Sequence, residues 1–126
     1  MHKINLSEKL AQFSDHWSPK IVGDLNGQHV KLVKFQGEFV WHHHADEDEM
    51  FLVLRGSFRM DYREPDGSEH HMQIGEGEFV IVPRGTEHRP YAAEEVHVLL
   101  FEPAGTSNTG NVREGRTVED PMRLLD

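Results

Sequence analysis

Residues 39–54 read FVWHHHADEDEMFLVL, and this stretch predicts a β framework that carries metal-binding side chains. An apolar run, a short acidic segment and a second apolar run indicate a strand, a tight turn and another strand. Because successive side chains of a strand point to opposite faces, His42 and His44 should project together, with Trp41 and His43 on the other face. Two imidazoles on one face can share a metal ion.

A carboxylate can join the two histidines if the chain reverses direction in the acidic segment. Glu49 is the last acidic residue before the run 50–54, and a hairpin would bring its side chain to the face of the histidines. The same alternation puts Phe51 and Val53 on the face of Glu49. Residues 46–48 are expected to form a solvated turn.

A third histidine follows a second turn. Residues 77–88 read GEFVIVPRGTEH, which predicts an apolar strand, a Pro-x-Gly turn and a histidine just beyond it. Proline fixes its own φ and glycine tolerates positive φ, so the turn is sharply defined. Three imidazoles and one carboxylate suit a divalent metal, so we predict a site formed by His42, His44, Glu49 and His88. The alternative is that the His-His-His tract is merely a solvated surface.

Both motifs resemble those of the cupin superfamily. The first cupin motif ends in His-x-His, four residues, Glu, six residues and Gly, and the segment from His42 to Gly56 fits this spacing. The second runs Gly, five residues, Pro-x-Gly, two residues and His, which fits the segment from Gly77 to His88.

The resemblance covers the motif segments 37–56 and 77–92, with 20 residues between the glycines that end the first and open the second. Two positions depart from the family pattern. The opening glycine is Gly37, one position late, and Ala92 replaces the closing asparagine. Both positions shape turns rather than bind metal, so the ligand set is unaffected.

An all-β fold is predicted for the rest of the chain, apart from a short N-terminal helix that begins at Asn5 and ends by the segment 17–19. Residues 23–27 form a hairpin turn around Asn-Gly, and two further turns, at residues 55–57 and 65–68, bracket a strand. The resemblance implies an antiparallel double-stranded β-helix, the jelly-roll or cupin barrel.

The chain is expected to be a single cupin domain spanning residues 1–126. Residues 104–126 are rich in Gly, Thr, Asn and charge, and we expect an extended segment with a short helix at residues 121–125. Its apolar side chains are expected to pack on the barrel exterior or on a neighbouring subunit. These side chains are Val112, Val118, Met122 and Leu124.

Composition excludes several classes of partner. The net charge of −9 argues against nucleic acid and against an anionic membrane surface. Cysteine is absent, so neither disulfides nor thiolate chemistry can occur. The N-terminus lacks an apolar signal core, no run approaches membrane-spanning length, and we expect a cytoplasmic protein. Strands 50–54 and 96–101 are apolar on both faces, which favours a homodimer, although the terminal segments could cover the outer face instead.

The predicted cofactor is one divalent first-row metal ion. Manganese, iron, nickel and cobalt suit three imidazoles and a carboxylate, whereas zinc is less natural at six-coordination. An octahedral ion would keep two cis positions for water, substrate or dioxygen.

The resemblance implies a metalloenzyme that acts on a small oxygen-rich molecule, such as a 2-oxo acid, a 2-hydroxy acid or a diketone. The reaction would be that of a dioxygenase, decarboxylase, isomerase or lyase. One alternative is a non-catalytic protein that binds a sugar or organic acid through the metal. Another is a structural protein whose ion stabilises the barrel.

Turnover would require a general acid or base near the metal. The candidates are His97, Tyr62 and Tyr91, and His97 could equally be a hydrogen-bonded core histidine. An apolar pocket around the metal is expected to be lined by Phe51, Met60 and Phe101.

Overall fold

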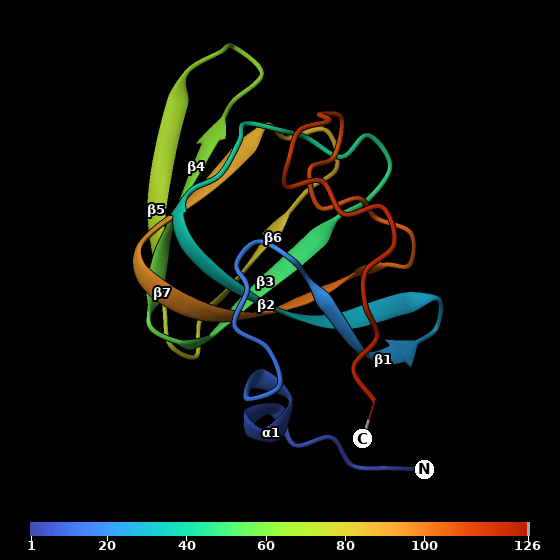
Figure 1. Ribbon diagram of the computed structural model, residues 1–126. Coiled ribbons are helices and arrows are strands. Elements are labelled where there is room, and N and C mark those ends of the chain that lie inside the picture. Colours follow the sequence, from blue (N-terminus) through green and yellow to red (C-terminus); the bar gives the residue numbers. More distant parts are fainter. Residues whose placement is uncertain (126) are drawn as a thin grey trace.

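Residues 1–125, which the computed structural model describes, form one short helix and seven strands (Figure 1). In chain order these elements are α1 (Leu6–Leu10), β1 (Lys20–Leu25), β2 (Gln28–Glu38), β3 (Glu49–Arg55), β4 (Ser57–Arg63), β5 (Glu69–Gly75), β6 (Phe79–Val82) and β7 (His88–Pro103). No helix within residues 1–125 is long and apolar enough to cross a membrane.

The long strand β7 organises the sheet. It pairs with β2 along most of its length, while its first residues pair with β4 and its later residues with β3. The strand order is β1-β2-β7-β3-β6, and β4 links β7 to β5. All these pairings are antiparallel, and the sheet curls into a barrel (Figure 1), so the predicted jelly-roll fold is confirmed.

The predicted hairpin between β1 and β2 is confirmed. Asn26 and Gly27 have φ values of 51° and 77°, which is the geometry that a two-residue turn between twisted strands requires. The helix α1 begins as predicted, since the Asn5 side chain accepts a hydrogen bond from the Glu8 amide. It ends earlier than expected, at Leu10, whose carbonyl accepts a hydrogen bond from the Lys34 ammonium group.

Strict alternation builds the barrel interior. Glu49, Phe51 and Val53 of β3 are buried, while Met50 and Leu52 between them are half-buried on the outer face. On β7 the fully buried Val98 is likewise an inward position. Glu49 therefore enters the barrel on the same face as the apolar core.

Two predicted elements are absent from the described residues. The strand expected at residues 39–44 is wrong, because β2 ends at Glu38 and the chain then crosses the barrel mouth with only an isolated bridge from His42 to His88. The helix expected at residues 121–125 is also wrong, because this segment is extended and exchanges backbone hydrogen bonds with Ile21.

Candidate metal centre

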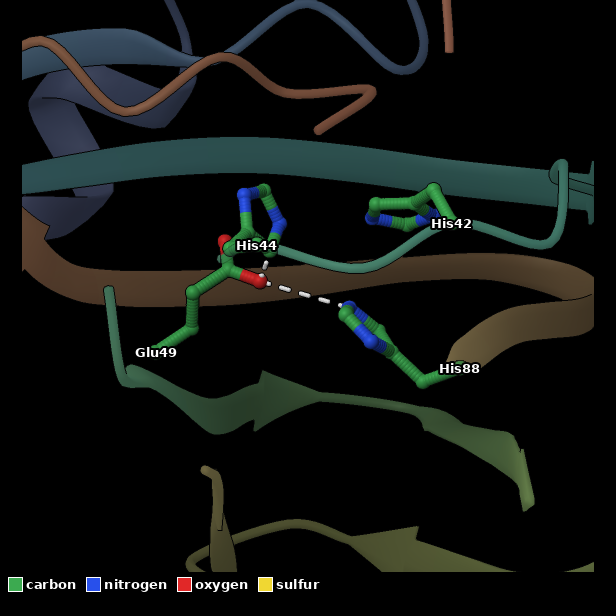
Figure 2. A group of neighbouring side chains, drawn as sticks. All are labelled: His42, His44, Glu49 and His88. Carbon is green, nitrogen blue, oxygen red and sulfur yellow. Dashed lines mark ion pairs between the residues drawn. The ribbon is translucent and has the colours of Figure 1, made fainter. Parts of the chain in front are cut away.

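Three segments of chain bring four ligand side chains to one point. His42 and His44 come from the loop after β2, Glu49 is the first residue of β3, and His88 is the first residue of β7 (Figure 2). One ligand atom from each of the four lies within 4.8 Å of the others, and all four residues are buried. The bridge from His42 to His88, with backbone N–H to carbonyl distances of 3.1 and 2.9 Å, keeps the loop extended at this point.

The ligand atoms are close together but not bonded to one another. Nε2 of His44 lies 2.7 Å and Nε2 of His88 lies 3.3 Å from Oε1 of Glu49 (Figure 2). All three atoms are buried without a hydrogen-bond partner. Buried polar atoms without a partner are costly, and a cation among them would satisfy all three at once. The residues present therefore fit a metal ion.

Backbone carbonyls orient two of the imidazoles. Nδ1 of His42 lies 3.0 Å from the Val40 carbonyl, and Nδ1 of His88 lies 2.8 Å from the Thr86 carbonyl. A carbonyl only accepts, so each Nδ1 must carry the proton. The lone pair of each Nε2 is then left for a metal, as is usual for metal-binding histidines.

Electrostatics favour the ligand-ready forms of the side chains. Burial, with a smaller contribution from His88, lowers the pKa of His42 to about 3, so its imidazole is neutral at physiological pH. Burial alone would raise the pKa of Glu49, but the neighbouring side chains of Glu102, His44 and His88 outweigh it and hold this pKa well below its usual range. Neutral imidazoles and an ionised carboxylate are the forms that bind metals.

An apolar cavity of about 30 Å³ adjoins the ligands. Its wall includes His42 and Glu49 together with aromatic rings from the barrel interior. The indole of Trp17 lines it and stacks on both Phe35 and Phe39, with ring centroids 4.4 and 4.5 Å apart. Trp17 has a φ of 61°, a conformation that is rare for a bulky residue.

The C-terminal segment supports the ligand loop from outside. The backbone amide of His43 donates to the side-chain oxygen of Asn111, and the Asn111 amide donates to the His43 carbonyl. In Figure 1 this segment, coloured red, lies beside the loop between β2 and β3. These two hydrogen bonds help to explain how a loop without regular structure holds two ligands in place.

The acid or base candidates lie in different surroundings. Tyr62 pairs in register with His88 on the neighbouring strand, on the inward-facing series of β4 that includes Met60. Tyr91 lies under the Arg59 guanidinium on the outer face. His97 is also on the outer face, with Nε2 3.0 Å from Oε1 of Glu95.

The three predicted pocket residues also lie in different places. Phe51 lines the cavity, whereas Met60 is buried in the core away from the cavity wall. The prediction that Phe101 lines the pocket is wrong. It lies on β7 between the buried Leu100 and Glu102, so alternation directs it to the outer face, where it pairs with Met50.

Sequence reasoning missed three residues at the site. Trp17 reaches the cavity from a segment that precedes the first strand. Lys31 and Glu102 are each 1% exposed and form an ion pair directly behind Glu49. Burial raises the pKa of Glu102 well above its usual range, and the nearby charge of Glu49 adds to this effect. A charged residue within an otherwise apolar strand was the sequence signal that could have indicated Lys31 and Glu102.

Comparisons with known proteins agree with this architecture. The sequence model of the Cupin domain family matches residues 29–102. The uncharacterised protein YdbB of Bacillus subtilis (strain 168) is 33% identical over 84 residues. That match covers 67% of this chain and 65% of YdbB, so the chain spans less than two thirds of the length of this relative.

Solved structures show the same fold. A cupin-2 domain containing protein from Shewanella frigidimarina NCIMB 400 is 40% identical, with a TM-score of 0.74 over 79% of this chain and 93% of that chain. Hydroquinone 1,2-dioxygenase PnpCD in complex with Fe³⁺ is 18% identical, with a TM-score of 0.72 over 82% of this chain and 33% of that chain. At this lower identity the likeness concerns the fold alone.

Proposed function

The chain belongs to the cupin domain family, and from this premise we propose that it is a metal-dependent enzyme that acts on a small oxygen-rich molecule. The substrate would be a 2-oxo acid, a 2-hydroxy acid, a diketone or a similar compound, and the reaction that of a dioxygenase, decarboxylase, isomerase or lyase. The observation that carries the proposal is the convergence of four buried ligands, three of them with a ligand atom that lacks a hydrogen-bond partner.

His42, His44, Glu49 and His88 would hold one divalent manganese, iron, nickel or cobalt ion, with zinc less suitable. Bound there, such an ion would supply Lewis acidity and two positions for oxygen ligands.

The other residues of the site would bind and shield the substrate. The cavity of about 30 Å³ has room for roughly one or two water molecules, so the substrate is small or displaces the Trp17 ring. Phe35, Phe39 and Phe51 in its wall exclude bulk water and strengthen electrostatic interactions within it. Tyr62, opposite His88, is the one acid or base candidate on an inward-facing series.

A non-catalytic metal-dependent binding protein is the second candidate. The outward positions of His97 and Tyr91 favour it, because they leave Tyr62 as the single predicted acid or base on an inward-facing series. In that case a sugar or organic acid would bind at the metal without being converted.

A second copy of the chain is the proposed protein partner, and it would cover the outer face of the sheet. Two apolar rows cross four strands there. The first row is Ile81, Met50, Phe101 and Val30, and the second is Phe79, Leu52, Leu99 and Leu32. Phe79 and Ile81 of the edge strand β6 are 60% and 54% exposed. Exposed apolar side chains of this kind suit a twofold contact between identical surfaces.

The proposed function is tested with untagged protein, because an affinity tag rich in histidine would itself bind metal. Samples loaded with manganese, or anaerobically with iron, are each mixed in aerated buffer with a panel of 2-oxo acids, 2-hydroxy acids and 1,2-diketones. Electron paramagnetic resonance is followed on the manganese sample, and substrate loss and dioxygen uptake on both.

We expect one class of compound to perturb the manganese signal and to be consumed. A compound that perturbs the signal without being consumed would contradict the proposed enzyme and support the non-catalytic binding protein. A metal signal that no compound disturbs would contradict both.

A further inference from the structure

A chain of buried charged side chains lies behind the ligand Glu49. Lys31 on β2, Glu102 on β7 and Glu49 on β3 come from three neighbouring strands, and they are 1%, 1% and 3% exposed. The Lys31 ammonium group donates to Oε1 of Glu102 over 2.9 Å. The carboxyl groups of Glu102 and Glu49 are close enough to interact directly, and this interaction lowers the pKa of Glu49 and raises that of Glu102.

The strand registers put these three side chains together. Glu102 pairs with His29 across β2 and β7, so Lys31, two residues along β2, lies diagonally opposite it on the same face. Met50 pairs with Phe101 across β3 and β7, which brings Glu49 level with Glu102. Oε2 of Glu102 is buried and accepts no hydrogen bond from any donor within the described residues, which fits a carboxyl group turned toward another carboxyl group.

Stability alone is a weak reason for this arrangement. Replacing a buried ion pair by apolar residues of similar size is often neutral or stabilising, because both charges lose their hydration. The Lys31–Glu102 pair is instead placed where one of its members contacts a metal ligand. Side chains in such positions orient the ligand and tune its affinity for the metal.

We propose that Glu102 is a positioning residue that holds the Glu49 carboxylate in its ligating orientation, and that Lys31 fixes Glu102 in turn. This inference rests on the proposed metal site. Oε1 of Glu49 faces His44 and His88, and in this role the Lys31–Glu102 pair holds the carboxyl group in that orientation. Without the pair, an empty space would lie behind Glu49, and its carboxyl group would no longer be held in this orientation.

The test compares metal affinity in variants that separate positioning from folding. Glu102→Gln keeps an acceptor for Lys31 and gains an N–H donor toward Glu49. The double variant Lys31→Met with Glu102→Leu removes the pair without leaving an unpaired buried charge. Val98→Ala, on the inner face of β7, is the control, because it weakens the core without altering the charged chain.

Manganese binding to untagged protein is measured by calorimetry, the manganese spectrum by electron paramagnetic resonance, and the folding of each metal-free variant by circular dichroism and thermal melting. We expect the double variant to bind manganese about 10- to 100-fold more weakly and to change the zero-field splitting of the bound ion. Glu102→Gln should recover most of the affinity. Val98→Ala should lower the melting temperature and leave affinity and spectrum unchanged.

A folded double variant with wild-type affinity and an unchanged spectrum would overturn the positioning role. Loss of affinity in Val98→Ala as large as in the double variant would do the same, since folding alone would then explain it. If wild-type protein bound no manganese, the proposed metal site itself would fail, so the two failures can be told apart.

Discussion

The backbone of Gly110 packs directly against the carbonyl group of His43, so that a β-carbon at residue 110 would overlap the carbonyl oxygen. The same β-carbon would lie 3.2 Å from Cδ2 of the ligand His42. Gly110 also has a φ of 55°, in the left-handed region that side chains disfavour. The C-terminal segment can therefore reach the ligand loop only if residue 110 is glycine.

Gly110→Ala should push the C-terminal segment away from the ligand loop and loosen His42 and His44. We expect lower thermal stability and weaker manganese binding, measured by melting curves and calorimetry. Gly115→Ala in the same segment is the matched control, because no atom lies within 4 Å of its β-carbon position. If both alanine variants behaved alike, the close contact at Gly110 would have no role in holding the ligands.

His88→Ala should abolish manganese binding or weaken it more than about 100-fold, because it removes a fully buried ligand from the centre of the site. His43→Ala should retain wild-type affinity, since its side chain is only half-buried and its backbone makes the contacts to Asn111. Calorimetry on metal-free protein checks both. Equal losses in the two variants would mean that the faces of the loop are assigned incorrectly.

The stability of the metal-free protein should depend on His42 in acid. The pKa of His42 is about 3 in the folded chain and near 6.5 in the unfolded chain, so between these values only the unfolded chain binds the proton. The contribution of His42 is therefore complete above about pH 6.5 and is lost as the pH falls toward about 3. One such group changes the free energy of unfolding by at most about 1.4 kcal/mol per pH unit.

Urea unfolding of wild type and His42→Gln, both with a chelator, isolates this effect. As the pH is lowered from about 7 to 4, we expect the free energy of unfolding to fall more in the wild type than in His42→Gln. Parallel pH profiles would show that His42 takes up its proton as readily in the folded state as in the unfolded one.

Phe79→Asp with Ile81→Asp should prevent dimer formation, because it places two charges in the apolar rows of the outer face. Light scattering after size exclusion should give about twice the chain mass of 14.5 kDa for wild type and the chain mass for the variant. Met72→Asp, on the exposed strand β5, is the control and should keep the wild-type mass. A wild-type protein of 14.5 kDa would contradict the proposed dimer.

Local signals in the sequence were enough to predict the turns and the candidate ligands. The Asn26-Gly27 turn has the geometry that its residue types favour. The spacing of His42, His44 and Glu49 predicted that their three side chains point to one side, and they do. From Glu49 onward, the alternation along β3 was also predicted correctly. These features depend on residues within about ten positions of one another, so short-range patterns describe them well.

Features that depend on contacts distant in sequence could not be predicted. Lys31 and Glu102 are 71 positions apart, and their pairing follows only from the register of β2 against β7. Whether Phe101 faces inward also depended on which of the two apolar faces of β7 the barrel encloses. Residues 39–44 were mistaken for a strand because their side chains alternate as in a strand, and in the structure a single backbone bridge at His42 keeps this part of the loop extended.

The central claim is that His42, His44, Glu49 and His88 together bind one divalent metal ion. Its most direct test is a calorimetric titration of metal-free, untagged wild-type protein with manganese, with the bound metal quantified afterwards by mass spectrometry. We expect saturation at one ion per chain. Absence of binding under conditions in which the chain is folded, or saturation at one ion per chain that persists in His88→Ala with unchanged affinity, would contradict it.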